Sequence, residues 1–245
     1  MPHTEELMSV EAVIFDWGGT LTEWAPVELE DMWQLAAEHL ADETGRHVPE
    51  LKRALHAAEL RMWDRVNKTQ YAGTLGEILA DASRELGLDV ASAVLSEVAK
   101  RHLDAWTPHM HHHADAFESL KRLKESGLKL GLLSNTHWPE TFHEHFLVRD
   151  GLAEWLDVRV YTSNLRHSKP HRETFMHVLG RLGVEPDKAV MVGDRPIDDV
   201  WGSQQVGMRG VWRPHEQCPP LGDVVPDAVI QRLEELPTLI ETWSK

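Results

Sequence analysis

Residues 13–22 read Val-Ile-Phe-Asp-Trp-Gly-Gly-Thr-Leu-Thr, and this segment constrains the fold more than any other. Its apolar residues predict a buried strand, and Asp16 falls where that strand ends. Gly18 and Gly19 follow, and they are small enough for backbone N–H groups to approach a ligand. A carboxylate presented in this way is suited to attack on a phosphoryl group.

Short apolar, β-branched runs recur along the chain, and helical patterns separate most of them. The runs lie at residues 12–15, 129–133, 158–161, 189–192 and 210–212, and a final strand is expected at 226–230. Amphipathic stretches occupy 140–155 and 173–182, and Gly183 ends the second. This alternation predicts an α/β fold with a doubly wound parallel sheet. Ligands bind beyond the carboxyl ends of such strands, where we expect Asp16, Ser134 and Asp194.

Residues 24–106 contain no strand-like run. Helical patterns lie at about 28–45, 49–68, 74–87 and 90–105. The spacing of Leu51, Leu55, Ala58 and Met62, for example, follows the helical period. We therefore expect a core domain of residues 1–23 and 107–245, with residues 24–106 inserted as an all-helical cap.

Composition limits the partners of the chain. A formal charge of −15 argues against a nucleic-acid surface, because duplex binding depends on basic side chains that neutralise phosphates. The single cysteine, Cys218, excludes an intramolecular disulfide and favours a reducing compartment. No signal-peptide pattern and no long uncharged apolar stretch is found. We expect a cytoplasmic monomer or homodimer with no nucleic-acid or membrane partner.

The segment around Asp16 resembles the first motif of the haloacid dehalogenase-like (HAD) hydrolases. Phosphatases of that superfamily carry Asp-x-Asp-Gly-Thr, in which the first Asp is the nucleophile and the second is the general acid and base. Asp16 matches the nucleophile, whereas Gly18 stands at the position of the second Asp. The resemblance implies the scaffold and leaves the chemistry open.

Three later segments are similar to the remaining motifs of the family, in the same order. Ser134, in Leu-Leu-Ser-Asn, matches the residue that hydrogen-bonds the transferring phosphoryl group, and Asn135 follows it. Lys169, in Ser-Lys-Pro, matches the lysine that would neutralise the nucleophile and the phosphate together. Asp194 and Asp199 match the fourth motif, Gly-Asp-x-x-x-x-Asp.

These carboxylates also predict a magnesium site. Mg²⁺ prefers carboxylate oxygens, water and substrate phosphate, and Asp16, Asp194 and Asp199 would supply hard oxygen ligands at one sheet edge. In the family, the backbone carbonyl two residues after the nucleophile binds the metal too, and here that carbonyl belongs to Gly18.

The resemblance thus implies a Mg²⁺-dependent hydrolase that forms an aspartyl phosphate from a small phosphorylated metabolite, with Trp17, Gly18 and Asn135 contacting the substrate. A positioned acid or base contributes about 10² to 10⁴ in rate, so its absence at Gly18 matters most for poor leaving groups. The substrate could have a good leaving group, such as an acyl phosphate, or another side chain could replace the acid. Candidates in the cap are His39, His47 and His56.

Two other activities remain open. Phosphonoacetaldehyde hydrolases of this superfamily carry Asp-Trp-Ala-Gly-Thr, which Trp17 and Gly18 match well. Those enzymes usually have arginine where Lys169 stands, however, and the cap lysines (Lys52, Lys68 and Lys100) fall in no lysine motif that we identify. Alternatively, the site could bind phosphate or metal as a catalytically weak or regulatory protein. Haloacid dehalogenases proper, which act without Mg²⁺, are disfavoured because they usually have tyrosine at the position of Gly18.

Several residues near the motifs have simpler interpretations. Asp198 is expected to be a surface charge or a helix N-terminal charge, and Arg195 either contacts phosphate or is an exposed loop residue. The histidines at 109 and 111–113 are expected to form a solvated hinge, because neighbouring residues cannot all converge on one zinc ion. The mouth of the pocket could be lined by Trp24, His137 and Trp138.

Overall fold

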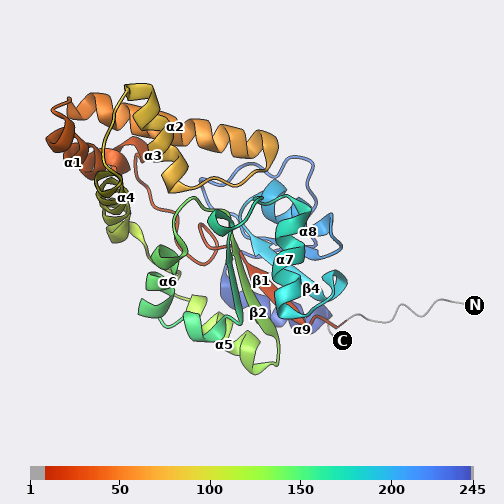
Figure 1. The fold of residues 1–245 in the computed structure, drawn as a ribbon. Helices are drawn as coiled ribbons and strands as arrows, with labels where there is room; N and C mark the ends of the chain where they lie inside the picture. The colour runs from red at the N-terminus through yellow and green to blue at the C-terminus, as the bar shows by residue number, and fades with distance from the viewer. Residues whose placement is uncertain (1–8, 244–245) are drawn as a thin grey trace, which may run out of the picture.

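A computed structural model describes residues 9–243, which form a six-stranded parallel sheet with helices on both faces (Figure 1). The strand order is β3-β2-β1-β4-β5-β6. The strands are β1 (Ala12–Phe15), β2 (Lys129–Ser134), β3 (Val158–Tyr161), β4 (Ala189–Gly193), β5 (Arg209–Trp212) and β6 (Ala228–Val229). The α/β fold class expected from the sequence is confirmed.

The register of the central strand brings the strand ends together. Phe15 of β1 pairs with Leu132 of β2 on one side and with Val192 of β4 on the other. The N–H of Asp16 donates to the carbonyl of Val192 at 2.9 Å, so pairing continues one residue further. Asp16, Ser134 and Asp194 therefore meet at the carboxyl edge of the sheet.

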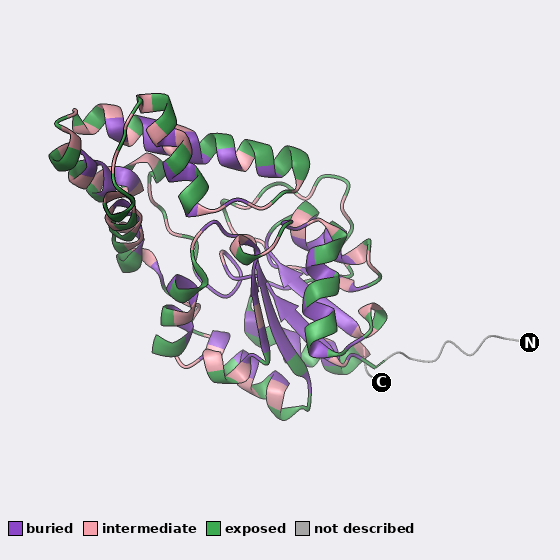
Figure 2. Ribbon diagram, viewed as in Figure 1, coloured by how far each residue is buried: buried purple, intermediate pink, exposed green. Residues whose placement is uncertain are grey.

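Successive residues of β1 pack against opposite layers of helices, as the period of a strand requires. Val13 and Phe15 belong to the hydrophobic cluster on one face, and Ala12 and Ile14 belong to the cluster on the other. The first cluster includes residues of α5 (Ala116–Glu125), α6 (Glu140–Arg149) and α9 (Leu236–Trp243). The second includes residues of α7 (Arg172–Leu182). The strands are consequently buried on both sides (Figure 2).

The inserted helices have a separate core. They are α1 (Gln34–Thr44), α2 (Val48–Thr69), α3 (Leu75–Leu86) and α4 (Ser92–Trp106), preceded by the 3-10 helix η1 (Leu29–Trp33) and followed by η2 (Thr107–His109). Their buried residues form a hydrophobic cluster of their own, which includes Trp33, Leu55 and Ile78. A capping box between Thr74 and Glu77 begins α3. The predicted helical cap is thus present, and its boundaries at 24 and 106 stay a prediction.

The cap also touches the core away from its two connections. The N–H of Ala72 donates to the carbonyl of Arg166 at 3.0 Å, and the N–H of Ser168 donates to the carbonyl of Gln70 at 2.9 Å. A third bond, of 2.8 Å, runs from the N–H of Leu75 to the carbonyl of His137. These contacts fasten the cap to the loop that carries Lys169 and to the loop that follows β2.

Two predicted elements differ in extent. The expected helix at 140–155 is divided, because Gly151 adopts a φ of 72° between α6 and the 3-10 helix η3 (Ala153–Trp155). This left-handed conformation ends a helix readily at glycine. The strand expected at 226–230 is reduced to Ala228–Val229.

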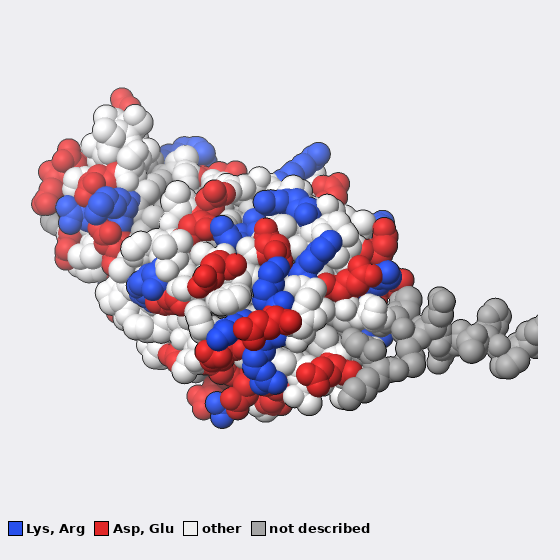
Figure 3. Space-filling model, turned by 90° about the horizontal axis from the view of Figure 1, so that it is seen from below, with Lys and Arg blue, Asp and Glu red and all other residues white. Residues whose placement is uncertain are grey.

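Charged side chains of both signs are mixed over the face shown in Figure 3, and neither sign covers it alone. Among residues 9–243, no helix has the length and apolar character needed to cross a membrane.

Candidate active site

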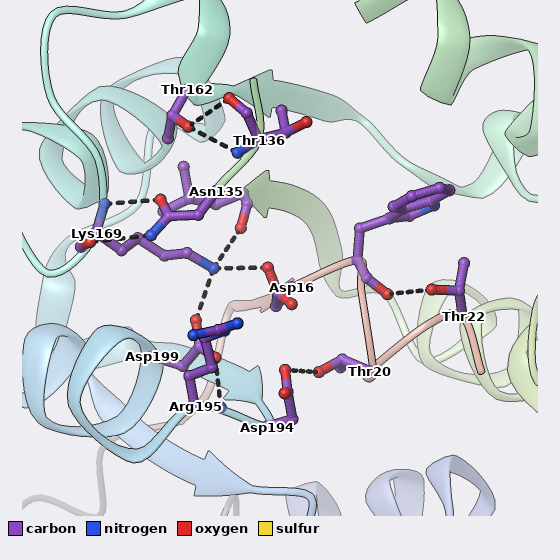
Figure 4. A network of polar contacts seen from close by, with 12 residues as sticks. Asp16, Thr20, Thr22, Asn135, Thr136, Thr162, Lys169, Asp194, Arg195 and Asp199 are labelled. Atoms are coloured by element: carbon purple, nitrogen blue, oxygen red, sulfur yellow. Dashed lines mark hydrogen bonds and ion pairs between the residues drawn. The ribbon is translucent and has the colours of Figure 1, made fainter. Parts of the chain in front are cut away.

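The ammonium group of Lys169 lies at the centre of the carboxyl edge of the sheet (Figure 4). Its Nζ donates to Asp16 Oδ1 at 2.7 Å, to Asp199 Oδ1 at 2.6 Å and to the carbonyl of Leu133 at 2.8 Å. Lys169 is only 3% exposed and Asp16 only 7% exposed. Residues 153 positions apart are thereby joined in one buried ion-pair network.

Asn135 holds the loop that carries Lys169. Its side-chain Nδ2 donates to the carbonyl of Lys169 at 2.9 Å, and its Oδ1 accepts from the N–H of Lys169 at 2.8 Å. Both polar ends of the amide are therefore engaged with the protein. The structure gives Asn135 a positioning task that the sequence did not indicate, and its expected contact with substrate stays a prediction.

Three buried carboxylates surround this lysine. One oxygen from each of Asp16, Asp194 and Asp199 lies within 4.8 Å of the others. Burial raises the pKa of Asp16 to about 6 and that of Asp199 to about 7, although the charge of Lys169 opposes both shifts. Burial also acts to lower the pKa of Lys169, but the charges of Asp16 and Asp199 outweigh it and raise that pKa.

The donor set fits a hard divalent cation. Lys169 is the only cation paired with these three buried carboxylates among the described residues, and Arg195 adds one nearby positive charge, so the two cations do not balance the three carboxylates. Oxygen donors from Asp16, Asp194 and Asp199 are the ligands that Mg²⁺ prefers. The site therefore has an excess of negative charge, which a bound Mg²⁺ would compensate.

Asp194 is oriented by a histidine that sequence reasoning missed. His215 Nδ1 accepts from the N–H of Gln217 at 3.2 Å, so in the neutral ring the proton lies on Nε2, which donates to Asp194 Oδ2 at 3.0 Å. The imidazole also lies against Gly19, where an added Cβ would come within 2.8 Å of Nε2. Trp24 stacks on His215 with 5.2 Å between ring centroids. No motif marks His215, because it lies in an irregular loop after β5.

The position of the missing carboxylate is open. A Cβ added at Gly18 would meet no atom within 4 Å, so a side chain could be accommodated there. The neighbouring Gly19, in contrast, has a φ of 79° and is crowded by the side chain of Asp194. Loss of the carboxylate at Gly18 is therefore not imposed by packing.

Trp17 is anchored away from solvent. Its Nε1 donates to His112 Nε2 at 3.2 Å, and His112 Nδ1 in turn contacts Asp150 Oδ2 at 2.6 Å. The side chain of His112 is 4% exposed, so the expectation of a fully solvated histidine hinge is wrong for this residue. The reason is long-range: Asp150 fixes the tautomer that accepts from Trp17.

Arg195 and Asp198 follow β4. The backbone N–H of Arg195 donates to Asp199 Oδ2 at 3.0 Å, and its exposed side chain lies beside Lys169 and Asp16 (Figure 4). Asp198 lies in the first turn of the π-helix η6 (Pro196–Trp201), as expected for a helix N-terminal charge. It is half-buried rather than at the surface, and burial raises its pKa to about 6.

Comparison with known proteins agrees with this arrangement. Residues 10–207 match the model of the haloacid dehalogenase-like hydrolases. The chain belongs to this family. It is therefore a HAD-like hydrolase, in which the motif residues identified above are gathered at the carboxyl edge of the sheet.

Named relatives include phosphatases and a dehalogenase. A glyceraldehyde 3-phosphate phosphatase of Methanopyrus kandleri is 28% identical over 66% of this chain and 70% of its own length. A phosphoserine phosphatase of Thermus thermophilus is 34% identical over 50% of this chain, a match that spans about half (48%) of that relative. Among solved structures, a 2-haloacid dehalogenase of Pseudomonas syringae pv. Tomato superposes with a TM-score of 0.73 at 26% identity and covers 96% of this chain and 99% of its own.

Proposed function

We propose that this HAD-like hydrolase is a Mg²⁺-dependent phosphatase of a small phosphorylated metabolite. The observation that carries the proposal is the contact of Lys169 Nζ with both Asp16 and Asp199, beside Asp194. This arrangement presents a carboxylate to an incoming phosphate while neutralising charge that would otherwise repel it. The relatives named as phosphatases support the same reaction class.

In the first step, a carboxylate oxygen of Asp16 forms a bond to phosphorus, and the bond from phosphorus to the leaving oxygen breaks. The leaving oxygen keeps the electron pair, and an aspartyl phosphate remains on the protein. In the second step, a water oxygen forms a bond to phosphorus while the bond between phosphorus and the Asp16 oxygen breaks. The carboxylate of Asp16 is regenerated, and the protons of the water leave with inorganic phosphate. Ser134, which ends β2 and is buried, would donate its hydroxyl to a phosphoryl oxygen.

The metal would be held by the carboxylates of Asp16, Asp194 and Asp199 and by the carbonyl of Gly18. A bound Mg²⁺ supplies positive charge at the phosphoryl oxygens. Lys169 would then neutralise only the part of the negative charge of the carboxylates and the phosphate that Mg²⁺ does not compensate. Asn135 positions the loop that carries Lys169 through its two hydrogen bonds, and Trp17 and Gly18 would contact the substrate.

The leaving group is expected to need little protonation. The carboxylate that would protonate a departing alcohol is replaced by Gly18, and the space beside this glycine is open. Of the cap histidines that could substitute for the acid, His56 has its Nδ1 4.0 Å from Glu59 Oε2, and His47 is exposed at the start of α2. We therefore propose that acyl phosphates are hydrolysed faster than alkyl phosphates.

The test is phosphate release from acetyl phosphate, alkyl phosphates and phosphonoacetaldehyde, with Mg²⁺ and with EDTA. Wild type is compared with Asp16→Asn, which keeps the shape of the side chain and removes the nucleophile. Release that requires both Mg²⁺ and Asp16 is the expected result. Turnover of phosphonoacetaldehyde alone would favour carbon–phosphorus cleavage instead, and release equal in both proteins would refute the assignment of Asp16.

A further inference from the structure

One buried carboxylate lies outside the site described above. Among residues 9–243, the buried acidic side chains are Asp16, Asp194, Asp199 and Glu59, and only Glu59 belongs to the cap. It lies on α2 and is 6% exposed. No lysine or arginine of the described residues pairs with it, and burial raises its pKa. Burial of a carboxylate without a counter-charge is costly, so the ionised form of Glu59 would be stabilised by a cation bound beside it.

The neighbours of Glu59 hold it in place without neutralising it. Trp33 Nε1 donates to Glu59 Oε2 at 2.7 Å. On the other side, His137 Nε2 lies 3.6 Å from Glu59 Oε1. His137 is 5% exposed, and neither of its ring nitrogens has a hydrogen-bond partner among the described residues. Burial holds the pKa of His137 well below its ordinary value, so this ring is neutral and is not the missing cation.

Aromatic rings surround the same carboxylate. Trp33 stacks on His102 with 3.7 Å between ring centroids, and Trp63 meets His137 edge-on at 5.6 Å. Trp63 follows Glu59 by four residues on α2, so both side chains lie on one face of that helix. Trp63 is half-buried, and His137 also lines a cavity together with Thr74, Leu75 and Leu103. Aromatic faces attract cations, and a carboxylate beside them adds an opposite charge for an ammonium group.

The Glu59 cluster and the phosphoryl site share the loop that follows β2. His137 follows Ser134 by three residues, and three residues of extended chain span at most about 10 Å. Trp138 contacts a residue of each region: its ring centroid lies 6.4 Å from that of Trp17, which follows Asp16, and 5.6 Å from that of His137, which contacts Glu59. The Glu59 cluster and the phosphoryl site are therefore connected through the loop that follows β2 and through Trp138.

We propose that Glu59, together with Trp63 and His137, binds an ammonium group on the leaving group of the substrate. The substrate is then a small phosphorylated amine, with its anionic end at Lys169 and its cationic end in the cap. This inference rests on the proposed phosphatase activity and narrows it to one substrate class. His137 contributes a neutral ring nitrogen that accepts a hydrogen bond from the ammonium group.

The test uses ligands that cannot be hydrolysed. In the presence of Mg²⁺, titration calorimetry compares 2-aminoethyl-, 3-aminopropyl- and 4-aminobutylphosphonate with the alkylphosphonates of equal length. Wild type is expected to bind at least one amine about tenfold or more tightly than its alkyl counterpart. Glu59→Gln, which keeps an acceptor for Trp33, is expected to remove this preference. Asp64→Asn, an exposed carboxylate on the same helix, is the control and is expected to keep it.

Equal binding of the two series by wild type, or no binding by either, would overturn the proposal without any variant. An amine preference that survives in Glu59→Gln would overturn it as well. Acetyl phosphate has no ammonium group, so its hydrolysis by wild type and by Glu59→Gln tests the phosphatase assignment separately. Loss of amine preference with acetyl phosphate hydrolysis intact is the expected combination.

Discussion

Replacing Lys169 with methionine should destabilise the protein strongly in a pH-dependent way. Lys169 makes two ion-pair contacts, of 2.7 and 2.6 Å, in a region where its own side chain is 1% exposed. Removing one partner from a buried ion pair costs about 3–5 kcal/mol of unfolding free energy. Because two carboxylates lose their counter-charge together, we expect the upper part of this range at pH 8 without divalent metal.

The sign of the pH effect follows from the two carboxyl groups. The pKa values of Asp16 and Asp199 are already raised to about 6 and about 7, and loss of Lys169 would raise them further. A carboxyl group whose pKa is higher in the folded state than in the unfolded state costs stability above that pKa. The cost is about 1.4 kcal/mol for each pH unit between the unfolded-state and folded-state pKa values, so it is complete above the folded-state pKa and declines as the pH falls toward the unfolded-state pKa. The variant should therefore be least destabilised near pH 5.

Urea unfolding followed by tryptophan fluorescence, in EDTA at pH 5 and pH 8, measures both effects. The matched control is Lys68→Met, which removes an exposed ion pair with Asp64 on α2 and should change stability by about 0.5 kcal/mol or less. A loss smaller than about 1 kcal/mol at pH 8 for Lys169→Met would refute the reasoning. So would an equal loss at the two pH values.

Four further outcomes are expected. Gly18→Asp should raise the rate of alkyl phosphate hydrolysis by about 10² to 10⁴ while changing acetyl phosphate hydrolysis little, and no gain in a phosphate-release assay would contradict the role assigned to the missing acid. Thr74→Ala should lower the unfolding free energy by about 1 kcal/mol in urea titration, because it removes the capping box of α3. Gly210→Ala should cost about 1–3 kcal/mol in the same assay, since its Cβ would lie 2.9 Å from backbone atoms of η6. Burial lowers the pKa values of His102 and His143 from 6.5 to about 3, so each stays neutral in the folded protein at pH 5. The unfolding free energy should therefore fall by about 1.4 kcal/mol per histidine for each pH unit below 6.5. His143→Gln should reduce this pH dependence, measured by urea titration at pH 6.5 and pH 5.

The residues at strand ends could be identified from the sequence because each follows a short apolar run. Asp16 and Asp194 directly follow β1 and β4, and Ser134 ends β2; parallel register brings such positions to one edge. Lys169 follows no strand directly, and only its resemblance to a family motif locates it in the sequence. Its contacts with Asp16 and Asp199 depend on a loop conformation that Asn135 holds, which no local pattern encodes.

Other functional candidates could not be found in this way. Glu59 occurs on a helix rich in charged residues, and a glutamate there usually faces solvent. It becomes distinctive only because Trp33, 26 residues earlier, and His137, on the core, pack against it. His112 is a similar case, since its role depends on Asp150, 38 residues away. Such pairs arise from tertiary packing, and helical or strand periodicity carries no signal for them.

The three backbone hydrogen bonds between the cap and the core affect the rate at which a substrate can enter the site. They join Gln70, Ala72 and Leu75 to the loops that carry Lys169 and His137, and Asp16 is 7% exposed. If each hydrogen bond stabilises the closed cap by about 1 kcal/mol, molecules with all three bonds formed outnumber molecules with the cap released by a factor on the order of 100. A metabolite that diffuses to the protein then meets an open cap in only about one encounter in a hundred. Association of a small metabolite would therefore be slow, and the turnover rate would depend on how often the three hydrogen bonds break and the cap opens.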